Sequence, residues 1–448
     1  MFSVFAQTYL TRGFWGDEAW TSLISQLPYS QMLKTTAADF HPPAYYSIVE
    51  AVYKFLPPTE IVTRSISIFF FLATIYLVYL LASLFKGPSF AKASEGRHLF
   101  GILSAVAVFV NPIFFRYAFE ARNYTLFAFA ATGSVYFLLR LSEKFTRKSA
   151  ILFVLFSTLG IYTHYYMFFT ILAEGLYVLL FDRKILVKTL GLGIACGVLY
   201  LPWIPFLAKQ VMSAGASFWI GAINISTHYE ALLRILAGEE QNAFQFPLFW
   251  LSAGLLLVGI YQHLVRRKFE KPYMLIWLWA IVPFILASLP GLKVDEFKFP
   301  LRPLFFWRYL IGASVPLSMV AVHSGQKLPP VLFKISIGAV LILALLIDFR
   351  TFFSSPYSFR EVYRDKVVPQ ITPGDTIVTV LPSFAEVTYY RNRSGITNNI
   401  VVLPEGLIQF SGKALLDTMA QDKSVTIEAT PSGRIFQMTP GPSLNVRE

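Results

Sequence analysis

The sequence predicts an all-α polytopic membrane protein that carries a small α/β domain at its C-terminal end. Of its 448 residues, 55% are hydrophobic and 14% are charged, whereas soluble domains contain about 25% charged residues. Aromatic residues reach 17%, and the mean hydropathy is +0.55. Because a soluble globule cannot bury that much apolar surface, the composition excludes one.

Ten apolar runs account for the predicted transmembrane helices, since a spanning helix needs about 20 mostly apolar residues. The runs cover residues 61–85, 99–115, 124–141, 150–163, 165–181, 189–207, 246–265, 273–289, 307–323 and 331–348. Residues 1–10 are too few to cross a bilayer, so we expect the first helix of the bundle to be truncated in this sequence. With that helix the bundle has about ten to eleven helices, in a transmembrane domain that covers residues 1–349.

Positive charge gathers in alternate loops. Sixteen Lys and Arg residues and only four acids fall in the loops at residues 86–97, 140–148, 182–188, 266–271 and 327–334. The intervening segments, 1–60, 116–123, 208–245 and 290–306, together hold 10 cations and 11 acids. The positive-inside rule therefore places the five loops in the cytoplasm and the intervening segments outside. The net charge of +12 is an orientation signal, and we expect no nucleic-acid partner.

Two extramembrane elements follow from this topology. Residues 350–448 form an external tail, in which prolines and glycines separate short β-like runs at 376–381, 400–403 and 425–429, so we predict an extracytoplasmic α/β domain. Residues 41–56 begin with His-Pro-Pro and leave about 13 residues, or roughly 20 Å of helix, which is too short to span a bilayer. We expect an amphipathic helix on the outer surface there.

The candidate chemical groups all fall on the predicted external side. Asp17 and Glu18, between Trp15 and Trp20, are either a general base for an acceptor hydroxyl or a solvated acidic pair at a helix N-terminus. Arg122 is either a phosphate clamp or an arginine that reaches the lipid headgroups, and Arg308 is similar. Lone histidines such as His41 are more often structural than ligands.

Several chemistries lack support in the sequence. No glycine-rich phosphate loop is present, so a soluble nucleotide donor has no visible docking element. The single cysteine, Cys196, excludes an internal disulfide and a thiolate metal cluster. No His and carboxylate spacing indicates a metal site, so no cofactor is evident, and a requirement for a divalent metal stays open.

Taken in order, the motifs resemble those of the integral-membrane GT-C glycosyltransferases, above all the branch of the protein O-mannosyltransferases and aminoarabinose transferases. An Asp-Glu pair in a first external loop, a His-Pro-Pro-x-Tyr-Tyr segment at 41–46 and Arg64 at the entry of the next span carry the likeness. It continues through residues 111–112, 120–124, 162–165, 201–205 and 308–309.

The resemblance implies an enzyme that moves a hexosyl or pentosyl group from a polyprenyl-phosphate donor to an acceptor hydroxyl, with inversion at C1. The acceptor is a protein, lipid or glycan, and the reaction lies at the extracytoplasmic face of the plasma (inner) membrane. Asp17 corresponds to the general base of that family, and Glu18 stands beside it in the predicted catalytic site. Arg122 and Arg308 are candidates for stabilising the phosphate. The predicted substrate-binding residues are His41, Arg122, Tyr124, Arg308 and Tyr309.

Two alternatives belong to other functional classes. A transporter or flippase for polyprenyl-linked or lipid substrates would need charged residues along a path through the bundle, and only Glu174 lies deep in a predicted span. A non-catalytic scaffold, whose external tail binds a partner, predicts that removal of Asp17 has no effect.

Overall fold

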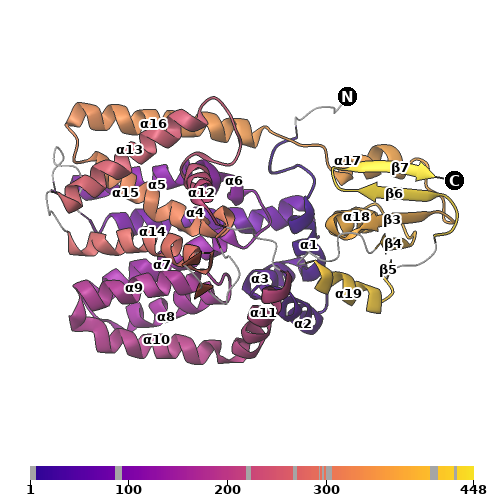
Figure 1. Ribbon diagram of the computed structural model, residues 1–448, viewed down its shortest axis with the longest axis horizontal. Coiled ribbons are helices and arrows are strands. Elements are labelled where there is room, and N and C mark those ends of the chain that lie inside the picture. Colours follow the sequence, from indigo (N-terminus) through magenta and orange to yellow (C-terminus); the bar gives the residue numbers. More distant parts are fainter. Residues whose placement is uncertain are drawn as a thin grey trace.

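The computed structural model describes residues 7–85, 93–217, 223–265, 270–291, 293–294, 297–298, 305–403, 412–427 and 431–447. A bundle of helices forms one end of the elongated molecule, and a small sheet flanked by helices forms the other (Figure 1). This arrangement confirms the predicted fold class, a helical membrane bundle with a C-terminal α/β region.

Six helical segments of the described chain are long and apolar enough to cross a bilayer. They are α4 (Glu60–Ala82), α7 (Tyr124–Glu143), α13 (Gln245–Leu264), α14 (Lys271–Ser288), α16 (Pro330–Phe352), and the run at Arg183–Met212 that contains α10 (Leu186–Tyr200) and the start of α11 (Ile204–Ser217). Each coincides with one of the predicted apolar runs.

The predicted run at 99–115 is broken in two. α5 (Ala93–Phe109) and α6 (Pro112–Ala118) meet at an angle of 68° and together make a possible seventh span. Asn111 caps α6, because its side chain accepts a hydrogen bond from the Phe114 backbone N–H at 3.2 Å. Pro112 follows at the first helical position, where its missing N–H costs no helical hydrogen bond. The chain therefore restarts a helix in a new direction here.

Three other predicted spans form shorter helices, so the part of the chain that the structure describes contains fewer long spans than the expected ten to eleven. α8 (Arg147–Ile161) and α9 (Met167–Phe181) have 15 residues each, or about 22 Å against a hydrocarbon core of about 30 Å. The run at 307–323 starts as a 3₁₀ helix, η4 (Trp307–Ala313), before α15 (Ser314–Gly325) continues it.

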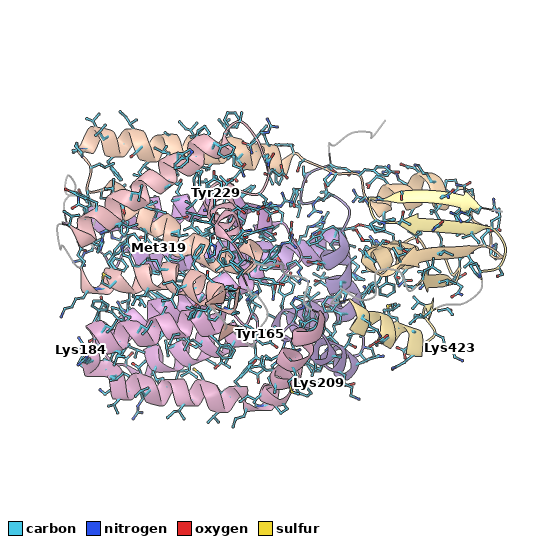
Figure 2. The ribbon with its side chains drawn as sticks, viewed as in Figure 1. Tyr165, Lys184, Lys209, Tyr229, Met319 and Lys423 are labelled. Atoms are coloured by element: carbon cyan, nitrogen blue, oxygen red, sulfur yellow. The ribbon has the colours of Figure 1, made fainter. Side chains whose placement is uncertain are left out.

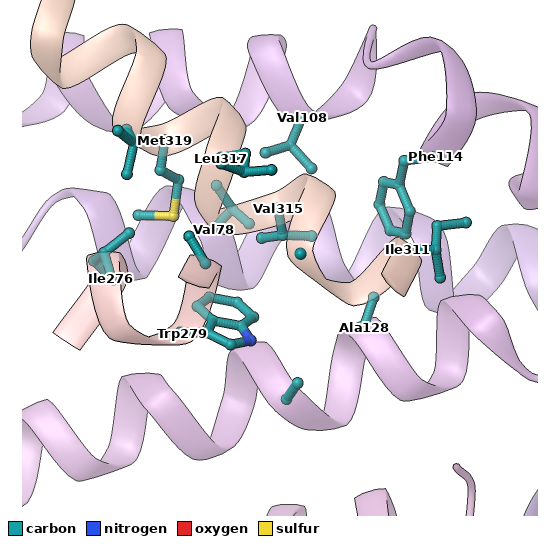
Figure 3. Close-up of a cluster of buried hydrophobic side chains, with 14 of the residues drawn as sticks. Val78, Val108, Phe114, Ala128, Ile276, Trp279, Ile311, Val315, Leu317 and Met319 are labelled. Atoms are coloured by element: carbon teal, nitrogen blue, oxygen red, sulfur yellow. The ribbon is translucent and has the colours of Figure 1, made fainter. Parts of the chain in front are cut away.

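The bundle has one continuous apolar core. Figure 3 shows side chains of α4, α5, α6, α7, α14, η4 and α15 meeting in it. Trp279 of α14 is the largest of these fully buried side chains. Its labelled neighbours in the figure include Val78, Val108, Phe114, Ala128, Ile276, Ile311, Val315, Leu317 and Met319.

Short helices lie between the bundle and the sheet (Figure 1). These helices are α1 (Gly16–Ser25), α2 (Tyr29–Ala38) and α3 (Ala44–Tyr53), which follow one another near the N-terminal end. Another short helix, α12 (Ile225–Ala237), packs within the bundle against α6, α13 and η4. The helix predicted within 41–56 is α3, which starts directly after Pro43 and has 10 residues.

The C-terminal region is a five-stranded sheet with strand order β5-β4-β3-β6-β7. The strands β3 (Thr376–Val380), β4 (Ile400–Leu403), β5 (Thr426–Ile427) and β6 (Ile435–Thr439) are parallel, and β7 (Ser443–Arg447) pairs antiparallel with β6. The three predicted β-like runs are β3, β4 and β5. The helices of this region are α17 (Phe359–Val362), α18 (Leu381–Arg393) and α19 (Lys413–Gln421).

A second apolar core joins the two ends of the chain. Phe14 and Trp20 from the N-terminal segment share it with Phe384 and Tyr390 of α18. The Phe14 backbone N–H donates a hydrogen bond of 2.6 Å to the Tyr390 hydroxyl, across 376 residues of sequence. The helices α1 and α2 thus pack against α18 and α19 of the C-terminal region.

The predicted cytoplasmic loops that the structure describes lie away from the sheet. Lys184 lies at the far end of the bundle, whereas Lys423 lies in the sheet region at the opposite end (Figure 2). The predicted loop cations at 86, 92 and 266–268 lie outside the described residues.

Candidate active site

The first turn of α1 sends two adjacent carboxylates in different directions. Trp15 precedes the helix in an extended conformation (φ −98°), and Asp17 and Glu18 follow in the first turn. Negative charge is stabilised there by the helix dipole. Successive residues of a helix point about 100° apart, so the two side chains face different surroundings.

Glu18 is completely buried and bound to protein groups. Its two oxygens accept hydrogen bonds from Arg64 Nε at 2.8 Å and Arg64 Nη2 at 2.7 Å. The Ala121 backbone N–H donates to Oε1 at 2.9 Å, and Arg12 Nη2 lies 3.4 Å from Oε2. Burial raises the pKa of Glu18, but the charges of Arg64 and Arg12 outweigh it, so the pKa is lowered overall. Glu18 is therefore an ionised link between α1 and α4.

Asp17 faces an open cavity and two arginines. Its Oδ2 lies 3.8 Å from Arg122 Nη2 and 3.6 Å from Arg308 Nη1. The Asp17 side chain keeps 38% of its surface exposed, while Arg122 is 5% exposed. Arg122 lies just before α7 and Arg308 lies in η4, so two distant segments bring their guanidinium groups to one carboxylate.

Each arginine is held by further contacts. Arg122 Nη2 lies 3.3 Å from His41 Nε2, and Nη1 lies 3.4 Å from the Asp17 carbonyl oxygen. The Arg308 guanidinium lies over the rings of Trp15 and Trp307, 5.1 and 5.0 Å from their centroids. Cation–π contacts of this kind fix the direction of a guanidinium group while leaving its N–H groups free to bind an anion.

The groups meet in a cavity of about 430 Å³. Six of the seven predicted site residues line it: Asp17, His41, Arg122, Tyr124, Arg308 and Tyr309. Glu18 does not, because it points into the protein toward Arg64. A cavity of this size is large enough for a small ligand such as a sugar phosphate head group.

A buried histidine supports the tyrosine wall of the cavity. The His164 ring, in the connection between α8 and α9, lies 5.6 Å from the Tyr309 ring and 5.0 Å from the Phe127 ring. Burial lowers the pKa of His164 to about 3, with smaller contributions from the charges of His41 and Arg122. The imidazole is therefore neutral, and its Nδ1 accepts a hydrogen bond from the Tyr166 backbone N–H.

Sequence reasoning missed Asp39 and the wall that comes from the C-terminal region. Asp39 stands two residues before His41, and this spacing was the available signal. The C-terminal wall is apolar and gave none, since its residues contact α1 across more than 350 positions. The additional lining residues are Trp15, Gly16, Trp20, Asp39, Phe306, Leu381, Pro382, Phe384, Ala385 and Gly412.

Metal ligands do not converge here. Within the residues that the structure describes, no three His, Cys, Asp or Glu side chains are arranged to hold a metal ion.

Comparison with solved structures identifies the fold. The crystal structure of ArnT from Cupriavidus metallidurans in the apo state superimposes with a TM-score of 0.64 at 12% sequence identity, over 96% of this chain and 90% of that chain. The structure of the same protein bound to undecaprenyl phosphate gives a TM-score of 0.66 at 12% identity, over 95% and 89% of the two chains. No protein-family model matches the sequence, and no curated protein sequence matches it.

The apolar helices and the fold place the chain among the multi-pass membrane proteins. Within that class the chain has the fold of ArnT, an aminoarabinose transferase. The predicted resemblance to the GT-C enzymes is thereby confirmed at the level of the fold.

Proposed function

We propose that this protein is a membrane glycosyltransferase that moves a sugar from a polyprenyl-phosphate donor to an acceptor hydroxyl, with Asp17 as the general base. The observation that carries the proposal is the convergence of Asp17, Arg122 and Arg308 in one cavity of a GT-C fold. The ArnT structure that binds undecaprenyl phosphate supports a polyprenyl-phosphate donor.

The proposed reaction is a single displacement. Asp17 takes the proton of the acceptor hydroxyl, whose oxygen attacks C1 of the sugar from the face opposite the phosphate, so the configuration at C1 is inverted. The bond between C1 and the phosphate oxygen breaks, and the leaving phosphate gains a second negative charge. Arg122 and Arg308 lie where they can stabilise that charge, and fixed cations act most strongly on charge that develops in the transition state.

The carboxylate of Asp17 is paired with both arginines. A donor phosphate would compete with Asp17 for these guanidinium groups, because phosphate and carboxylate present similar oxygen pairs. Donor binding would therefore release Asp17 from its two partners and leave its oxygens available to the acceptor hydroxyl. We infer that the donor binds first and the acceptor second.

We place the reaction on the extracytoplasmic side of the plasma (inner) membrane. The cavity is lined by residues of α1, η4 and α18. Lys184, in a predicted cytoplasmic loop, lies at the end of the bundle far from the C-terminal sheet (Figure 2).

The test is transfer from radiolabelled polyprenyl-phosphate sugars to candidate protein, lipid and glycan acceptors by the purified protein. We expect Asp17→Asn to reduce transfer at least about 100-fold, the usual contribution of a general base. The matched control is Asp365→Asn, the same substitution at an exposed carboxylate that pairs with Arg364 outside the cavity. Transfer that survives undiminished in Asp17→Asn would refute the assignment of the base.

A further inference from the structure

The cavity contains a second carboxylate that the proposed mechanism does not use. Asp39 follows α2 directly, and it is 3% exposed although it lines the cavity. Its Oδ2 lies 3.3 Å from His41 Nδ1, and its Oδ1 has no hydrogen-bond partner in the described part of the chain. A buried carboxylate oxygen without a partner is costly, so a cation or a hydrogen-bond donor beside Asp39 is favoured.

His41 connects this carboxylate to the phosphate clamp. Its Nδ1 faces Asp39, while its Nε2 lies 3.3 Å from Arg122 Nη2. A guanidinium group can only donate hydrogen bonds, so Nε2 accepts in this arrangement and Nδ1 carries the hydrogen that points at Asp39. Asp39 thereby fixes the tautomer of the ring in this arrangement.

When an anion binds to Arg122, the hydrogen-bonding role of His41 Nε2 changes from acceptor to donor. Once an N–H of Arg122 is directed at a phosphate oxygen, Nε2 no longer receives that hydrogen, and the nearby negative charge favours protonation of the ring. A protonated His41 would donate from Nε2 to the phosphate and from Nδ1 to Asp39. The charge of Asp39 balances the imidazolium inside the protein, as an orienting carboxylate does for other imidazoles.

We propose that Asp39 and His41 are a proton-accepting pair that takes up one proton when a polyprenyl phosphate binds, which makes His41 a third cationic ligand of the phosphate. Asp39 is the positioning residue of the pair. The inference rests on the proposed function and adds to it a proton linkage at the donor site.

The surroundings of His41 favour this pair over other titrating groups. The Trp20 ring of α1 lies 5.9 Å from the imidazole and the Tyr46 ring of α3 lies 6.3 Å from it, and neither carries charge. His164 is neutral for the reason given above. The charged groups that share the cavity with His41 are Asp17 from α1, Asp39, Arg122 from the segment before α7, and Arg308 from η4.

The experiment is calorimetric titration of the purified full chain with undecaprenyl phosphate, in buffers of different ionisation enthalpy and over a range of pH. The difference between buffers gives the number of protons taken up, without reference to catalytic activity. For the wild type we expect uptake approaching one proton beyond that of the His41→Gln variant. If binding takes up one proton, the dissociation constant for undecaprenyl phosphate should increase with pH. The increase should reach up to about tenfold per pH unit at pH values above the one at which the pair loses its proton.

The variants separate the possible outcomes. The His41→Gln variant measures the proton uptake that is due to the phosphate itself, and this value is subtracted from that of the wild type. The Asp39→Asn variant should keep the contact with Nδ1 but take up fewer protons and bind undecaprenyl phosphate more weakly at acidic pH. The control is His98→Gln, which replaces an exposed histidine of α5 beside Tyr79 and should behave as the wild type. Equal proton uptake in the wild type and His41→Gln would overturn the inference. A wild type without any saturable binding of undecaprenyl phosphate would instead count against the proposed function.

Discussion

At the scale of single residues, Asp17 and Glu18 are adjacent in the chain but opposite in role. Asp17 keeps 38% of its side-chain surface exposed and lines the cavity. Among the described lining residues, Asp39 is the other carboxylate. Glu18 has no exposed surface and accepts hydrogen bonds from four N–H groups: Nε and Nη2 of Arg64 and the backbone N–H groups of Trp15 and Ala121. The geometry of the helix therefore leaves Asp17 accessible from the cavity and places Glu18 in the protein interior, where it stabilises the fold.

This contrast predicts different consequences for two similar substitutions. Glu18→Gln should destabilise the protein, because loss of one partner of a buried ion pair costs about 3–5 kcal/mol and leaves Arg64 without a counter-ion. Asp17→Asn should leave the thermal unfolding temperature close to that of the wild type, since the group is partly solvated. Thermal unfolding of the detergent-solubilised variants measures both. A Glu18→Gln protein with wild-type stability but no transfer activity would show that Glu18 takes part in the reaction.

Gly238 tests how far stability depends on the backbone conformation of a single residue. It ends α12 with φ +84°, and an added Cβ would lie 2.9 Å from Pro112 Cβ. Both the positive φ and the contact oppose a side chain, so Gly238→Ala should cost about 1–3 kcal/mol. Gly338, in α16, has open space around its missing Cβ, and Gly338→Ala should be neutral or stabilising by up to about 1 kcal/mol. Equal unfolding temperatures for the two variants would contradict this account of the turn.

At the scale of elements, the contact between α1 and α18 closes the site. α18 follows β3 and brings Leu381, Phe384 and Ala385 to the cavity wall. On the side of α18 toward α1, Glu386 lies near the backbone of Gly16, and the Oε2 atom is 3.8 Å from the position a Gly16 Cβ would take. Burial raises the pKa of Glu386 to about 8, and the charges of Asp17 and Glu18 act in the same direction.

The raised pKa makes this contact sensitive to pH. Glu386 is protonated in the folded protein up to about pH 8, whereas its ordinary value is 4.5. Its contribution to stability is therefore fully present below about pH 4.5 and is lost as the pH rises toward 8. Between pH 5 and 8 the unfolding temperature of the wild type should fall, relative to that of Glu386→Gln, by about 2 °C or more. Parallel curves for the two proteins would show that the carboxyl group is ionised throughout.

Element boundaries also show what a single sequence can predict. The apolar runs located every long helix, because about 20 consecutive apolar residues admit few other structures. The run at 99–115 did not reveal its own break, although Asn111 and Pro112 carry the signal: a capping side chain followed by proline starts a new helix. A hydropathy average over about 20 residues does not detect such a pair, although the pair ends one helix and starts the next.

At the scale of the whole molecule, the site lies where two cores meet. The bundle core holds η4 and the start of α7, which supply Arg308 and Tyr124. The second core holds α1 and α18, which supply Asp17 and the apolar wall. The sequence predicted six of the cavity residues because they lie in compact motifs at or near the ends of predicted spans. It gave no indication of the C-terminal wall, since apolar periodicity shows that a face is buried but not which distant segment covers it.

The orientation of the whole molecule in the membrane gives the last prediction. Cys196 is the single cysteine of the sequence and is buried in α10, so Cys196→Ala provides a background free of thiols. Cysteine is then introduced at one of two exposed lysines, Lys184 in the predicted cytoplasmic loop or Lys413 at the start of α19. In right-side-out membrane vesicles, a membrane-impermeant maleimide should label Lys413→Cys at once and Lys184→Cys only after permeabilisation. The physical reason is the uneven charge: the five predicted cytoplasmic loops hold 16 cations, and such loops are retained in the cytoplasm. Labelling in the reverse order would place the cavity and its carboxylate on the cytoplasmic side, and would remove the extracytoplasmic acceptor from the proposed reaction.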